Sequence, residues 1–459
     1  MGTPRCDCAS FLVLVVFACF LHHGAADKSQ PPAGEAEILL QIKRAWGDPP
    51  ALSAWNTIAS SAGAHCRWPY VGCDAAGRVT RLTLGSTNVT GRIPDVVGSL
   101  SSLTHLDISN NSITGVFSKV LYHCRSLQYL NLSTNYIGGE LPSDIGHGLS
   151  ANMSTLDLGT NEFNGTIPTS MSRLRNLRYL TLDDNDLTGN IPTELGDLTN
   201  LETLWLAQNP FDVGELPASF KNLNSLVSFW VSNCSLVGNF PSYLVKMHEL
   251  KILDLSMNSL NGSIPPRIWS LRKLQALVVY RNNLIGDIVV DGFASMSLTI
   301  IDFSQNNLTG TIPEVFGHLE NLTDLYLFSN NLSGEIPRSI GRLPSLRMLR
   351  LYGNRLSGTL PPELGKHSPS FFYFEADDND LTGRIPEGLC AGGQLWSFTA
   401  SNNRLNGSIP VGLADCASLH GLYLENNQLS GAIPANFGYG TPLLKRLKLR
   451  NNKLSGRIG

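Results

Sequence analysis

The sequence lacks the short motifs on which most catalytic and nucleotide-binding sites depend. It contains no Gly-rich phosphate loop, no HRD or DFG triplet, no HExxH, no GxSxG, no paired CxxC and no calcium-loop spacing. We therefore expect that the chain is not an enzyme by itself and that it carries no cofactor and no metal.

The chain also lacks an excess of positive charge. Its 34 Lys and Arg residues are balanced by 37 Asp and Glu residues, giving a formal net charge of −3 and a pI near 6.4. Nucleic-acid binding relies on basic surfaces that neutralise phosphates. The composition therefore argues against a nucleic-acid partner.

Long hydrophobic runs are missing except at the start of the chain. Arg5 precedes the apolar run Phe11–Leu21, and small residues end at Ala26. This order predicts a secretory signal peptide over residues 1–26. A membrane anchor is the alternative, but the run is shorter than the ~20 residues of a spanning helix. We expect a secreted chain, or the outer part of a protein whose membrane segment is not in this sequence.

A pattern of apolar residues at offsets 0, 3 and 5, Asn at 8, Leu at 10, Gly at 12 and Ile-Pro at 14 and 15 fills most of the chain. Residues 322–345, LTDLYLFSNNLSGEIPRSIGRLPS, show it in full. The alternation at 3 and 5 predicts a strand with one buried face, Asn330 marks the inward turn, and Gly334 permits a tight bend. Sixteen copies recur at 24 to 26 residues, which predicts a leucine-rich-repeat solenoid.

The sixteen coils begin at Val79, Leu103, Leu127, Met153, Leu177, Leu201, Leu226, Leu250, Leu274, Leu298, Leu322, Leu346, Phe371, Leu395, Leu419 and Leu444. The expected fold is an α/β solenoid, a plant-type leucine-rich-repeat superhelix with a parallel concave β-sheet. The repeats occupy residues 79–459, with the last one incomplete.

Residues 27–78 are expected to cap the first coil. AEILLQIKRAW has apolar residues at helical spacing, and the Gly47–Pro50 segment stops it. Trp46, Trp55 and Trp68 are predicted to form the core of this cap. Cys66 and Cys73 flank a tryptophan in HCRWPYVGC just before the first repeat, and a small cap needs a covalent staple. A disulfide between them is predicted.

The remaining cysteines carry different expectations. Cys234 stands where other coils carry the turning Asn, so we expect a buried, inert thiol. Cys124 and Cys416 share one register, which favours buried thiols on the convex side. Cys390 and Cys416 lie on successive coils, so a disulfide between them is the other interpretation. The sequence leaves both open.

Eleven sequons accompany the signal peptide and predict a glycoprotein. Asn131 is expected to project from the concave strands, where a glycan would obstruct partners near the N-terminal end. The candidate N-glycosylation sites are Asn88, Asn110, Asn131, Asn152, Asn164, Asn233, Asn261, Asn307, Asn321, Asn331 and Asn406.

Function is expected on the concave face, where offsets 2, 4 and 6 of every coil point outward. From the sixth coil these offsets become aromatic, and an aligned column of exposed rings has little structural reason. It predicts a groove of ~40 Å for an extended peptide of about a dozen residues, at ~5 Å per strand. The predicted ligand-binding residues are Trp205, Trp230, Tyr280, Tyr326, Phe328, Arg350, Tyr352, Tyr373 and Asp377, with Arg446 and Lys448 as a carboxylate site.

Three segments carry a resemblance to a known family. WVSNCSLVG, PPELGKHSPSFFYFEADDNDLTGRIPEGLCAGGQL and LADCASL, with the cap sequence CRWPYVGC, resemble the extracellular domain of plant leucine-rich-repeat receptor kinases of the HAESA-like subgroup. The resemblance spans essentially residues 27–459. It implies a cell-surface receptor, on the extracellular side of the plasma membrane. Such a receptor binds a secreted peptide and recruits a shorter leucine-rich-repeat co-receptor kinase.

The chain departs from that family in two ways. Members often carry an Arg-x-Arg pair that grips the peptide's C-terminal carboxylate, but the matching positions here are Gly421 and Tyr423. Arg446 and Lys448 stand one coil later, and Lys lacks the two-pronged guanidinium. This favours a differently shaped peptide, such as a disulfide-closed one.

The second departure is that the chain ends at Gly459, inside its sixteenth coil. We expect it to be the truncated sensor of a serine/threonine kinase. The alternatives are a soluble decoy without a signalling domain and a secreted inhibitor of wall-degrading enzymes. Such inhibitors resemble shorter solenoids of about ten coils with a cysteine-bearing C-terminal cap, so the length of this chain argues against the last reading.

Overall fold

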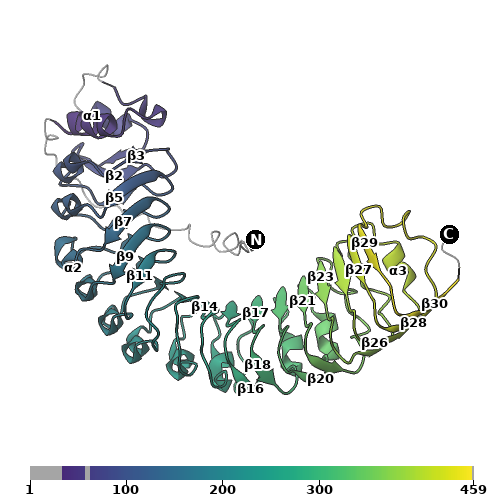
Figure 1. Cartoon of the computed structure of the whole chain (residues 1–459). Helices are drawn as coiled ribbons and strands as arrows, with labels where there is room; N and C mark the ends of the chain where they lie inside the picture. Colours follow the sequence, from purple (N-terminus) through teal and green to yellow (C-terminus); the bar gives the residue numbers. More distant parts are fainter. Residues whose placement is uncertain (1–33, 57–62, 457–459) are drawn as a thin grey trace.

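The repeats form a curved solenoid whose inner face is one long sheet (Figure 1). This computed structural model describes residues 34–56 and 63–456, so the expected signal peptide lies outside the described residues. The sheet has 17 strands: β1 (Val71–Cys73) pairs antiparallel with β2, and the parallel strands follow one per coil. They are β2 (Val79–Thr83), β4 (His105–Asp107), β6 (Tyr129–Asn131), β8 (Thr155–Asp157), β10 (Tyr179–Thr181), β12 (Thr203–Trp205), β13 (Ser228–Trp230), β14 (Ile252–Asp254), β15 (Ala276–Val278), β17 (Ile300–Asp302), β19 (Asp324–Tyr326), β21 (Met348–Arg350), β23 (Tyr373–Glu375), β25 (Ser397–Thr399), β27 (Gly421–Tyr423) and β29 (Arg446–Lys448). Among the described residues, each of the sixteen predicted coils contains one of these parallel strands.

Each strand buries one side and presents the other to solvent, as the alternation predicted. In the eleventh coil, Leu322, Leu325 and Leu327 are fully buried. Tyr326 lies between two of them on β19 and is half-buried, facing outward. The outward offsets 2, 4 and 6 of successive coils therefore form one continuous concave surface.

A ladder of buried asparagines holds consecutive coils together. Asn330 donates from Nδ2 to the carbonyl oxygens of Phe303, Leu327 and Phe328 at 2.9, 3.2 and 3.3 Å. Its Oδ1 accepts the backbone N–H of Leu308 at 3.0 Å. The side chain thus satisfies four backbone groups that no strand pairing reaches, which confirms the predicted role of Asn at offset 8.

The chain bends after this asparagine and continues with Leu332 and Ile336 buried in the core. Gly334 has φ +76°, and a Cβ there would lie 2.8 Å from Cγ2 of Thr311, so glycine is required. Short parallel strands then form a second row. The first five make one sheet: β3 (Thr90–Gly91), β5 (Ser112–Val116), β7 (Tyr136–Glu140), β9 (Glu162–Thr166) and β11 (Asp186–Thr188). The others make two pairs, β16 (Ile285–Asp287) with β18 (Asn307–Thr309) and β20 (Ser333–Glu335) with β22 (Arg355–Ser357), and a sheet of four: β24 (Thr382–Gly383), β26 (Arg404–Gly407), β28 (Gln428–Ala432) and β30 (Lys453–Ser455).

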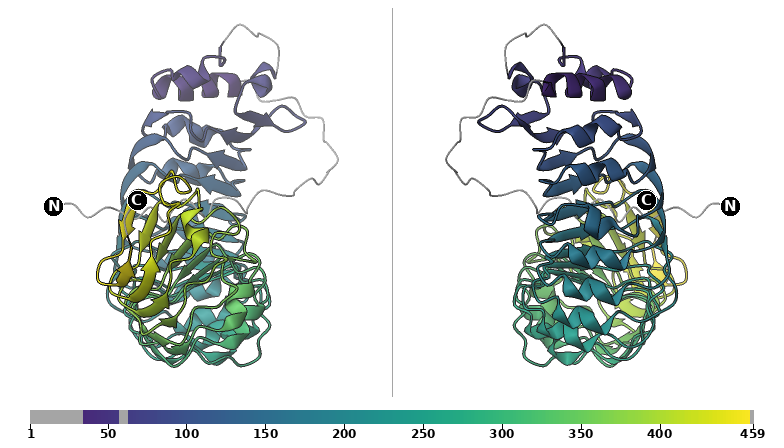
Figure 2. Two further views of the ribbon diagram at one scale, coloured as in Figure 1. Left: turned by 90° about the vertical axis from the view of Figure 1, so that its right-hand side faces the viewer. Right: turned by 90° about the vertical axis from the view of Figure 1, so that its left-hand side faces the viewer.

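The convex side consists of short helical turns, most of which directly follow a proline. Pro337 is extended, with ψ 129°, and directly precedes the 3₁₀-helix η12 (Arg338–Arg342). The other turns are η4 (Asp95–Ser99), η5 (Lys119–His123), η6 (Thr169–Arg173), η7 (Thr193–Asp197), η8 (Ala218–Asn222), η9 (Ser242–Lys246), η10 (Pro266–Ser270), η11 (Glu314–His318), α2 (Ile145–Gly148) and α3 (Val411–Ala414). Side views show these coils stacked regularly from the N-terminal cap onward (Figure 2).

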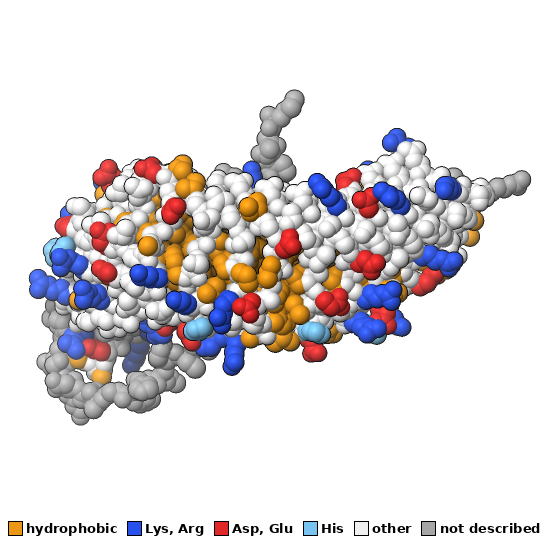
Figure 3. All heavy atoms as spheres, turned by 90° about the horizontal axis from the view of Figure 1, so that it is seen from below, with side chains coloured by type: hydrophobic (Ala, Val, Ile, Leu, Met, Phe, Trp, Pro, Cys, Tyr) orange, Lys and Arg blue, Asp and Glu red, His pale blue; other side chains and the backbone are white. Residues whose placement is uncertain are grey.

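The outer face of the solenoid mixes apolar and charged side chains. Seen from below, hydrophobic atoms gather along its middle, and Lys, Arg, Asp and Glu side chains are scattered over it and along its edges (Figure 3). Within residues 34–56 and 63–456, no helix has both the length and the apolar character needed to cross a bilayer.

The N-terminal cap covers the first coil with α1 (Glu35–Ala45), η2 (Pro50–Leu52) and η3 (Ala64–Arg67). Trp46, Trp55 and Trp68 are buried in the same hydrophobic core as the coils, as predicted. The predicted disulfide between Cys66 and Cys73 is present. Apolar burial therefore holds the cap against the solenoid, and the disulfide closes a loop within the cap.

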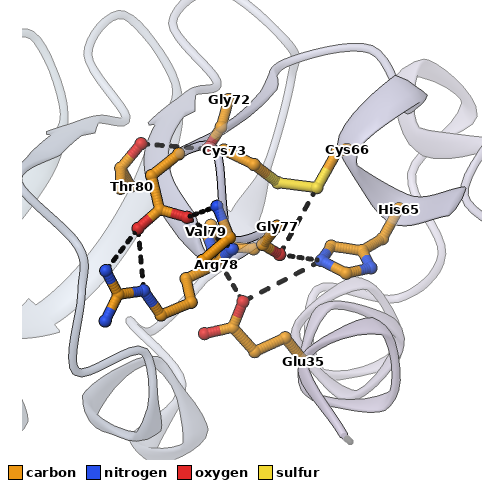
Figure 4. The surroundings of a disulfide bond; sticks show 11 residues. Glu35, His65, Cys66, Gly72, Cys73, Gly77, Arg78, Val79 and Thr80 are labelled. Atoms are coloured by element: carbon orange, nitrogen blue, oxygen red, sulfur yellow. Dashed lines mark hydrogen bonds and ion pairs between the residues drawn. A yellow bond between two sulfur atoms is a disulfide. The ribbon is translucent and has the colours of Figure 1, made fainter. Parts of the chain in front are cut away.

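A buried polar contact joins the cap to the first strand beside this disulfide (Figure 4). Oε2 of Glu35 accepts the backbone N–H of Val79 at 2.6 Å. Nε2 of His65 lies 3.1 Å from the Gly77 carbonyl oxygen and 3.9 Å from Oε2 of Glu35. Burial is the main cause that raises the pKa of Glu35. Glu35 thereby supplies the acceptor that a preceding coil would otherwise offer to β2.

The other cysteines fall into two groups. Cys124 and Cys234 are free and buried, as expected. Sγ of Cys234 lies 3.3 Å from the carbonyl oxygens of Leu206 and Ser232, so the thiol occupies the place of a ladder asparagine. Cys390 and Cys416 form a disulfide between successive coils. Of the two interpretations left open, the bonded one holds for Cys416.

Candidate functional site

Two tryptophans stand side by side on the concave face of the sixth and seventh coils. Trp205 and Trp230 are paired in register on β12 and β13, and their ring centroids lie 5.6 Å apart, edge to face. Each indole N–H donates to a serine hydroxyl: Trp205 to Ser228 at 2.8 Å and Trp230 to Ser232 at 2.7 Å. Both rings are half-buried, so they form a rigid apolar step.

A second aromatic cluster surrounds Arg350 in the middle of the sheet. The guanidinium carbon lies 5.7 Å from the ring centre of Tyr326, 5.2 Å from Phe328, and 5.9 Å from both Tyr352 and Tyr373. Phe328 and Tyr352 stack at 4.5 Å. Cation–π attraction to four rings holds the guanidinium in place. We call Tyr326, Phe328, Arg350, Tyr352 and Tyr373 the arginine cluster.

An acidic side chain completes the arginine cluster. Nε of Arg350 donates to Oε2 of Glu375 at 2.5 Å, and 35% and 14% of the two side chains are exposed. The hydroxyl of Tyr326 donates to Oδ1 of Asp324 at 2.7 Å, and burial followed by Asp324 raises the pKa of this tyrosine. Arg350 was predicted as a direct ligand contact. In the structure its charge already has a partner, and the residue organises the rings around it.

The aromatic residues do not form the single aligned column that the sequence pattern predicted. Asp254, Val278 and Asp302 occupy offset 4 in the three coils between Trp230 and Tyr326. Burial raises the pKa of both Asp254 and Asp302 to about 6, although Ser256 and Ser304 donate to them. Tyr280 lies half-buried at offset 6 of the ninth coil. The face therefore presents two aromatic clusters, separated by three coils that carry Asp254, Val278 and Asp302 at offset 4.

Beyond the arginine cluster the concave surface opens into a hollow of about 590 Å³. The hollow exists because offsets 2, 4 and 6 of the fourteenth coil are Ser397, Thr399 and Ser401, and Gly421 follows on β27. Larger side chains flank this low floor. The lining residues are Tyr373, Glu375, Asp377, Asp378, Trp396, Ser397, Thr399, Ser401, Asn402, His420, Gly421, Tyr423, Glu425, Lys445, Arg446 and Lys448. The hollow thus joins four of the predicted residues, namely Tyr373, Asp377, Arg446 and Lys448.

The charged walls of the hollow are unequally satisfied. Oδ1 of Asp377 accepts the N–H of Ser401 at 2.7 Å, the Thr399 hydroxyl donates to Oδ2, and burial raises the pKa of this carboxyl. Nζ of Lys448 lies 3.8 Å from Oε1 of Glu425. Oε2 of Glu425 is enclosed and has no hydrogen-bond partner, and it is the one such buried side-chain atom among the described residues.

A ladder of side chains runs along the rim of the face at offset 1 of the twelfth to fifteenth coils. Arg347 lies 5.5 Å from the ring centre of Phe372, Phe372 stacks on Trp396 at 5.8 Å, and Trp396 stacks on His420. Trp396 is 40% exposed. These four residues are called the rim ladder below.

The sequons are distributed unevenly. Asn131 is half-buried on the concave strand β6, where its Oδ1 accepts the backbone N–H of Ser133 at 2.9 Å. Asn152 and Asn321 precede a strand. The other eight lie at offsets 7 to 11, on the edge that follows the strands: Asn88, Asn110, Asn164, Asn233, Asn261, Asn307, Asn331 and Asn406. The edge that carries the rim ladder has no sequon in those coils.

Sequence reasoning missed the small floor of the hollow, the rim ladder, Glu375 and Glu425. The signal for the floor was present, because three small polar residues at offsets 2, 4 and 6 interrupt a series of large ones. Glu375 had no comparable signal. Its importance comes from its contact with Arg350 on the neighbouring strand.

Comparisons with known proteins agree with this architecture. Family models match as "Leucine-rich repeat region" at residues 156–283, "Leucine rich repeat" at 77–137 and 296–356, "Leucine rich repeat N-terminal domain" at 32–74 and "Leucine Rich Repeat" at 418–439. Among curated relatives, polygalacturonase inhibitor 1 of Oryza sativa is 32% identical over 96 residues, and the receptor protein kinase EMS1 of Arabidopsis thaliana is 37% identical over 92. These alignments cover 21% and 20% of this chain, but only 28% and 7% of the relatives' lengths.

Solved structures cover far more of the chain. The Arabidopsis receptor kinase HAESA, in complex with the peptide hormone IDA and the co-receptor SERK1, superposes with a TM-score of 0.87. The identity is 36%, over 93% of this chain and 71% of that one. A TDR receptor gives a TM-score of 0.77 at 35% identity, over 81% of this chain and 64% of that one.

Proposed function

The chain belongs to the ectodomains of plant leucine-rich-repeat receptor kinases of the HAESA-like type, and on this premise we propose that it binds a secreted peptide along its concave face. The observation that carries the proposal is the arginine cluster, a half-buried group of four rings held rigid by one guanidinium. Rigid aromatic side chains at the centre of a surface are the usual binding hot spots.

The peptide lies extended across the strands. The Trp205 and Trp230 pair offers an apolar step for its first part, the arginine cluster receives the middle, and the hollow receives the last part. Strands spaced at ~5 Å make the path from the sixth to the thirteenth coil ~40 Å long, which suits about a dozen residues, and the hollow extends it by about 15 Å to the sixteenth coil. Arg446 and Lys448, paired with neighbours in register on β29 and β27, are the candidate carboxylate contacts.

A co-receptor with a shorter leucine-rich-repeat ectodomain is the proposed second partner. Its docking surface is the rim ladder with Trp396 at its centre, next to the bound peptide. This edge combines an exposed aromatic side chain with a basic residue, which is typical of protein interfaces. The absence of sequons from this edge in the twelfth to sixteenth coils leaves it accessible.

The proposed location is the extracellular side of the plasma membrane. HAESA and EMS1 are receptor kinases. The corresponding parent of this chain would be a serine/threonine protein kinase, with the present residues as its sensor. The chemistry of phosphotransfer would then belong to a part of the protein outside this sequence.

Alanine substitutions in the arginine cluster test the peptide groove. We would display a synthetic dodecapeptide library on beads, select binders with the glycosylated chain, and measure the affinity of the best binder by calorimetry. Tyr326→Ala and Arg350→Ala should each weaken it by about 1 to 3 kcal/mol. Tyr136→Ala, on the exposed second-row strand β7, is the matched control. Unchanged affinity in both cluster variants would exclude this groove.

A secreted inhibitor of polygalacturonase is the second candidate, favoured by the local identity to the rice inhibitor. The two candidates separate in one assay. At stoichiometric concentration, an inhibitor would lower the rate at which fungal polygalacturonase cleaves pectate. Alanine variants of the arginine cluster would inhibit the enzyme equally well. A peptide receptor would leave the rate unchanged.

A further inference from the structure

The hollow beyond the arginine cluster contains a buried carboxylate oxygen that no described residue satisfies. Oε2 of Glu425 is enclosed but accepts no hydrogen bond, whereas its Oε1 lies 3.8 Å from the nearest cation, Nζ of Lys448. That separation exceeds a hydrogen bond. An ionised carboxylate without donors is expensive to keep out of water. Glu425 is therefore a site prepared for a donor from another molecule.

The other acids around the hollow already have partners. Glu375 binds Arg350, Asp377 accepts from Ser401 and Thr399, and Oδ1 of Asp378 accepts from Nδ2 of Asn402 at 2.7 Å. Because these carboxylates already accept hydrogen bonds, Oε2 of Glu425 is the buried acceptor among the described residues of the hollow that still lacks a donor. The surrounding negative charges still favour a cation there over a neutral donor.

The basic side chains of the hollow are held to one side. Nζ of Lys448 lies 4.8 Å from the ring centre of Tyr423, and Nη1 of Arg446 lies 3.4 Å from the Tyr423 hydroxyl. The ring can lie there because residue 421 is glycine: a Cβ on Gly421 would be 2.9 Å from Cε2 of Tyr423. Tyr423, on the fifteenth coil, thus holds both cations of the sixteenth coil beside its own ring.

The floor leaves room for a long side chain. Ser397, Thr399 and Ser401 occupy the fourteenth coil where the neighbouring coils carry Tyr373, Glu375, Tyr423 and Glu425, and the volume of about 590 Å³ exceeds that of one residue. Aromatic walls from Tyr373, Trp396 and Tyr423 suit the methylene stem of a basic side chain.

We propose that this hollow is a subsite for one lysine or arginine side chain of the peptide ligand, with Glu425 as its counter-charge. The inference rests on the proposed peptide-binding function and names the chemical class of residue recognised at one end of the groove. Oε2 has almost no accessible surface in the structure, so a turn of the Glu425 carboxylate about its Cγ–Cδ bond presents it to the incoming cation. The ammonium of Lys448 remains over the Tyr423 ring.

Three dodecapeptide sublibraries that differ in one fixed residue test this subsite. The fixed residue, placed at each position in turn, is arginine, norleucine or glutamate. At the best position the wild-type chain should retain the arginine sublibrary about tenfold more than the norleucine one. Glu425→Gln should abolish this preference and leave the retention of the norleucine sublibrary unchanged. Glu335→Gln, on the exposed second-row strand β20, should behave as wild type.

A small probe tests the same atom independently of the groove. In saturation-transfer NMR, Nα-acetyl-arginine amide should give a signal with wild type that is lost in Glu425→Gln, and Nα-acetyl-norleucine amide should give none with either. The unfolding temperature of the variant should not fall below that of wild type, because Oε2 of Glu425 makes no hydrogen bond that the change to glutamine could remove. This measurement separates a lost contact from a lost fold.

The outcomes distinguish the subsite from the groove. Equal retention of arginine and norleucine, a preference that survives Glu425→Gln, or absence of the arginine-amide signal overturns the subsite. Preference for glutamate also overturns it and assigns the hollow to Arg446 and Lys448. If Tyr326→Ala and Arg350→Ala leave every sublibrary unaffected, the proposed groove fails, whatever the residue preference.

Discussion

Arg350 and Glu375 lie opposite each other on neighbouring strands, and Nε of the arginine donates to Oε2 of the glutamate at 2.5 Å. The pair fixes the guanidinium among four aromatic rings, so a charge that would otherwise be available to a ligand instead orders the centre of the concave face. The energetic link between these two residues can be measured.

A double-mutant cycle should give a coupling free energy of about 1 kcal/mol between Arg350 and Glu375. The reason is that the pair is only partly exposed and is reinforced by cation–π contacts, so it exceeds an ordinary surface ion pair. Arg350→Gln, Glu375→Gln and the double variant would be compared by chemical denaturation. Lys273 and Glu249, an exposed pair on adjacent coils, provide the control cycle. A coupling no larger than in this control would contradict the prediction.

Replacing a ladder asparagine should be costly. Asn330→Ala removes one acceptor and three donor contacts and leaves buried backbone groups of Leu308 and Phe303 unsatisfied. We expect a loss of about 3 kcal/mol in the free energy of unfolding, since each unsatisfied buried group costs ~1 to 3 kcal/mol. Asn222→Ala, an exposed asparagine at the end of η8, should change it by less than ~0.5 kcal/mol. Similar losses in both variants would show that the ladder has no special role.

Cys124 and Cys234 should be unreactive in the native protein. Burial raises the pKa of Cys124 to about 11 and that of Cys234 to about 12, and both thiols are inaccessible. Only the thiolate reacts readily with alkylating agents. Peptide mapping after iodoacetamide treatment should find both residues unmodified at mildly alkaline pH and both modified in denaturant. Cys390 and Cys416, which form a disulfide, should resist alkylation in either condition until a reductant is added.

Two buried aspartates should make the protein more stable in mild acid. The pKa of Asp254 and of Asp302 rises from 3.8 to about 6 on folding, so between these values the folded state binds more protons than the unfolded state. Stability therefore falls as the pH rises from about 4 to above 6. The unfolding temperature should be higher at pH 5 than at pH 7.5.

Variants can assign this pH dependence to the two carboxyls. Asp254→Asn with Asp302→Asn should reduce it, because an amide keeps the acceptor for Ser256 and Ser304 but does not titrate. The remaining dependence is expected from Asp183, whose pKa burial raises to about 7. Asp186→Asn on the exposed strand β11 is the control. An unchanged slope in the double variant would assign the effect to other groups.

The repeat spacing was readable from the sequence because it depends on local rules. Apolar alternation, the asparagine at offset 8 and the glycine at offset 12 each satisfy a need of the backbone, and Leu325, Asn330 and Gly334 behave as predicted. The left-handed turn at offset 7 was not readable. It is occupied by residues as different as Arg281, Gln305 and Ser329, because only the backbone is used there.

Contacts between side chains of neighbouring coils could not be predicted from the sequence pattern. The aromatic residues could be placed on the face, and their interruption by Asp254, Val278 and Asp302 at offset 4 was present in the sequence, but the contacts of four rings with Arg350 across strands were not. The same applies to Glu425, whose enclosed oxygen follows from the position of Lys448 and Tyr423. The disulfide of Cys390 and Cys416 required the coil-to-coil geometry, so the sequence alone left two outcomes.

The separation of ladder and face positions has a consequence for how such a molecule diversifies. Asn330 and the leucines beside it maintain the stack, while the side chains of Asp324, Tyr326 and Phe328 are not part of the asparagine ladder or of the buried core. A change at offsets 2, 4 or 6 therefore alters the recognised surface without removing a ladder contact. New binding specificities can therefore arise by single substitutions on the concave surface, without rebuilding the scaffold.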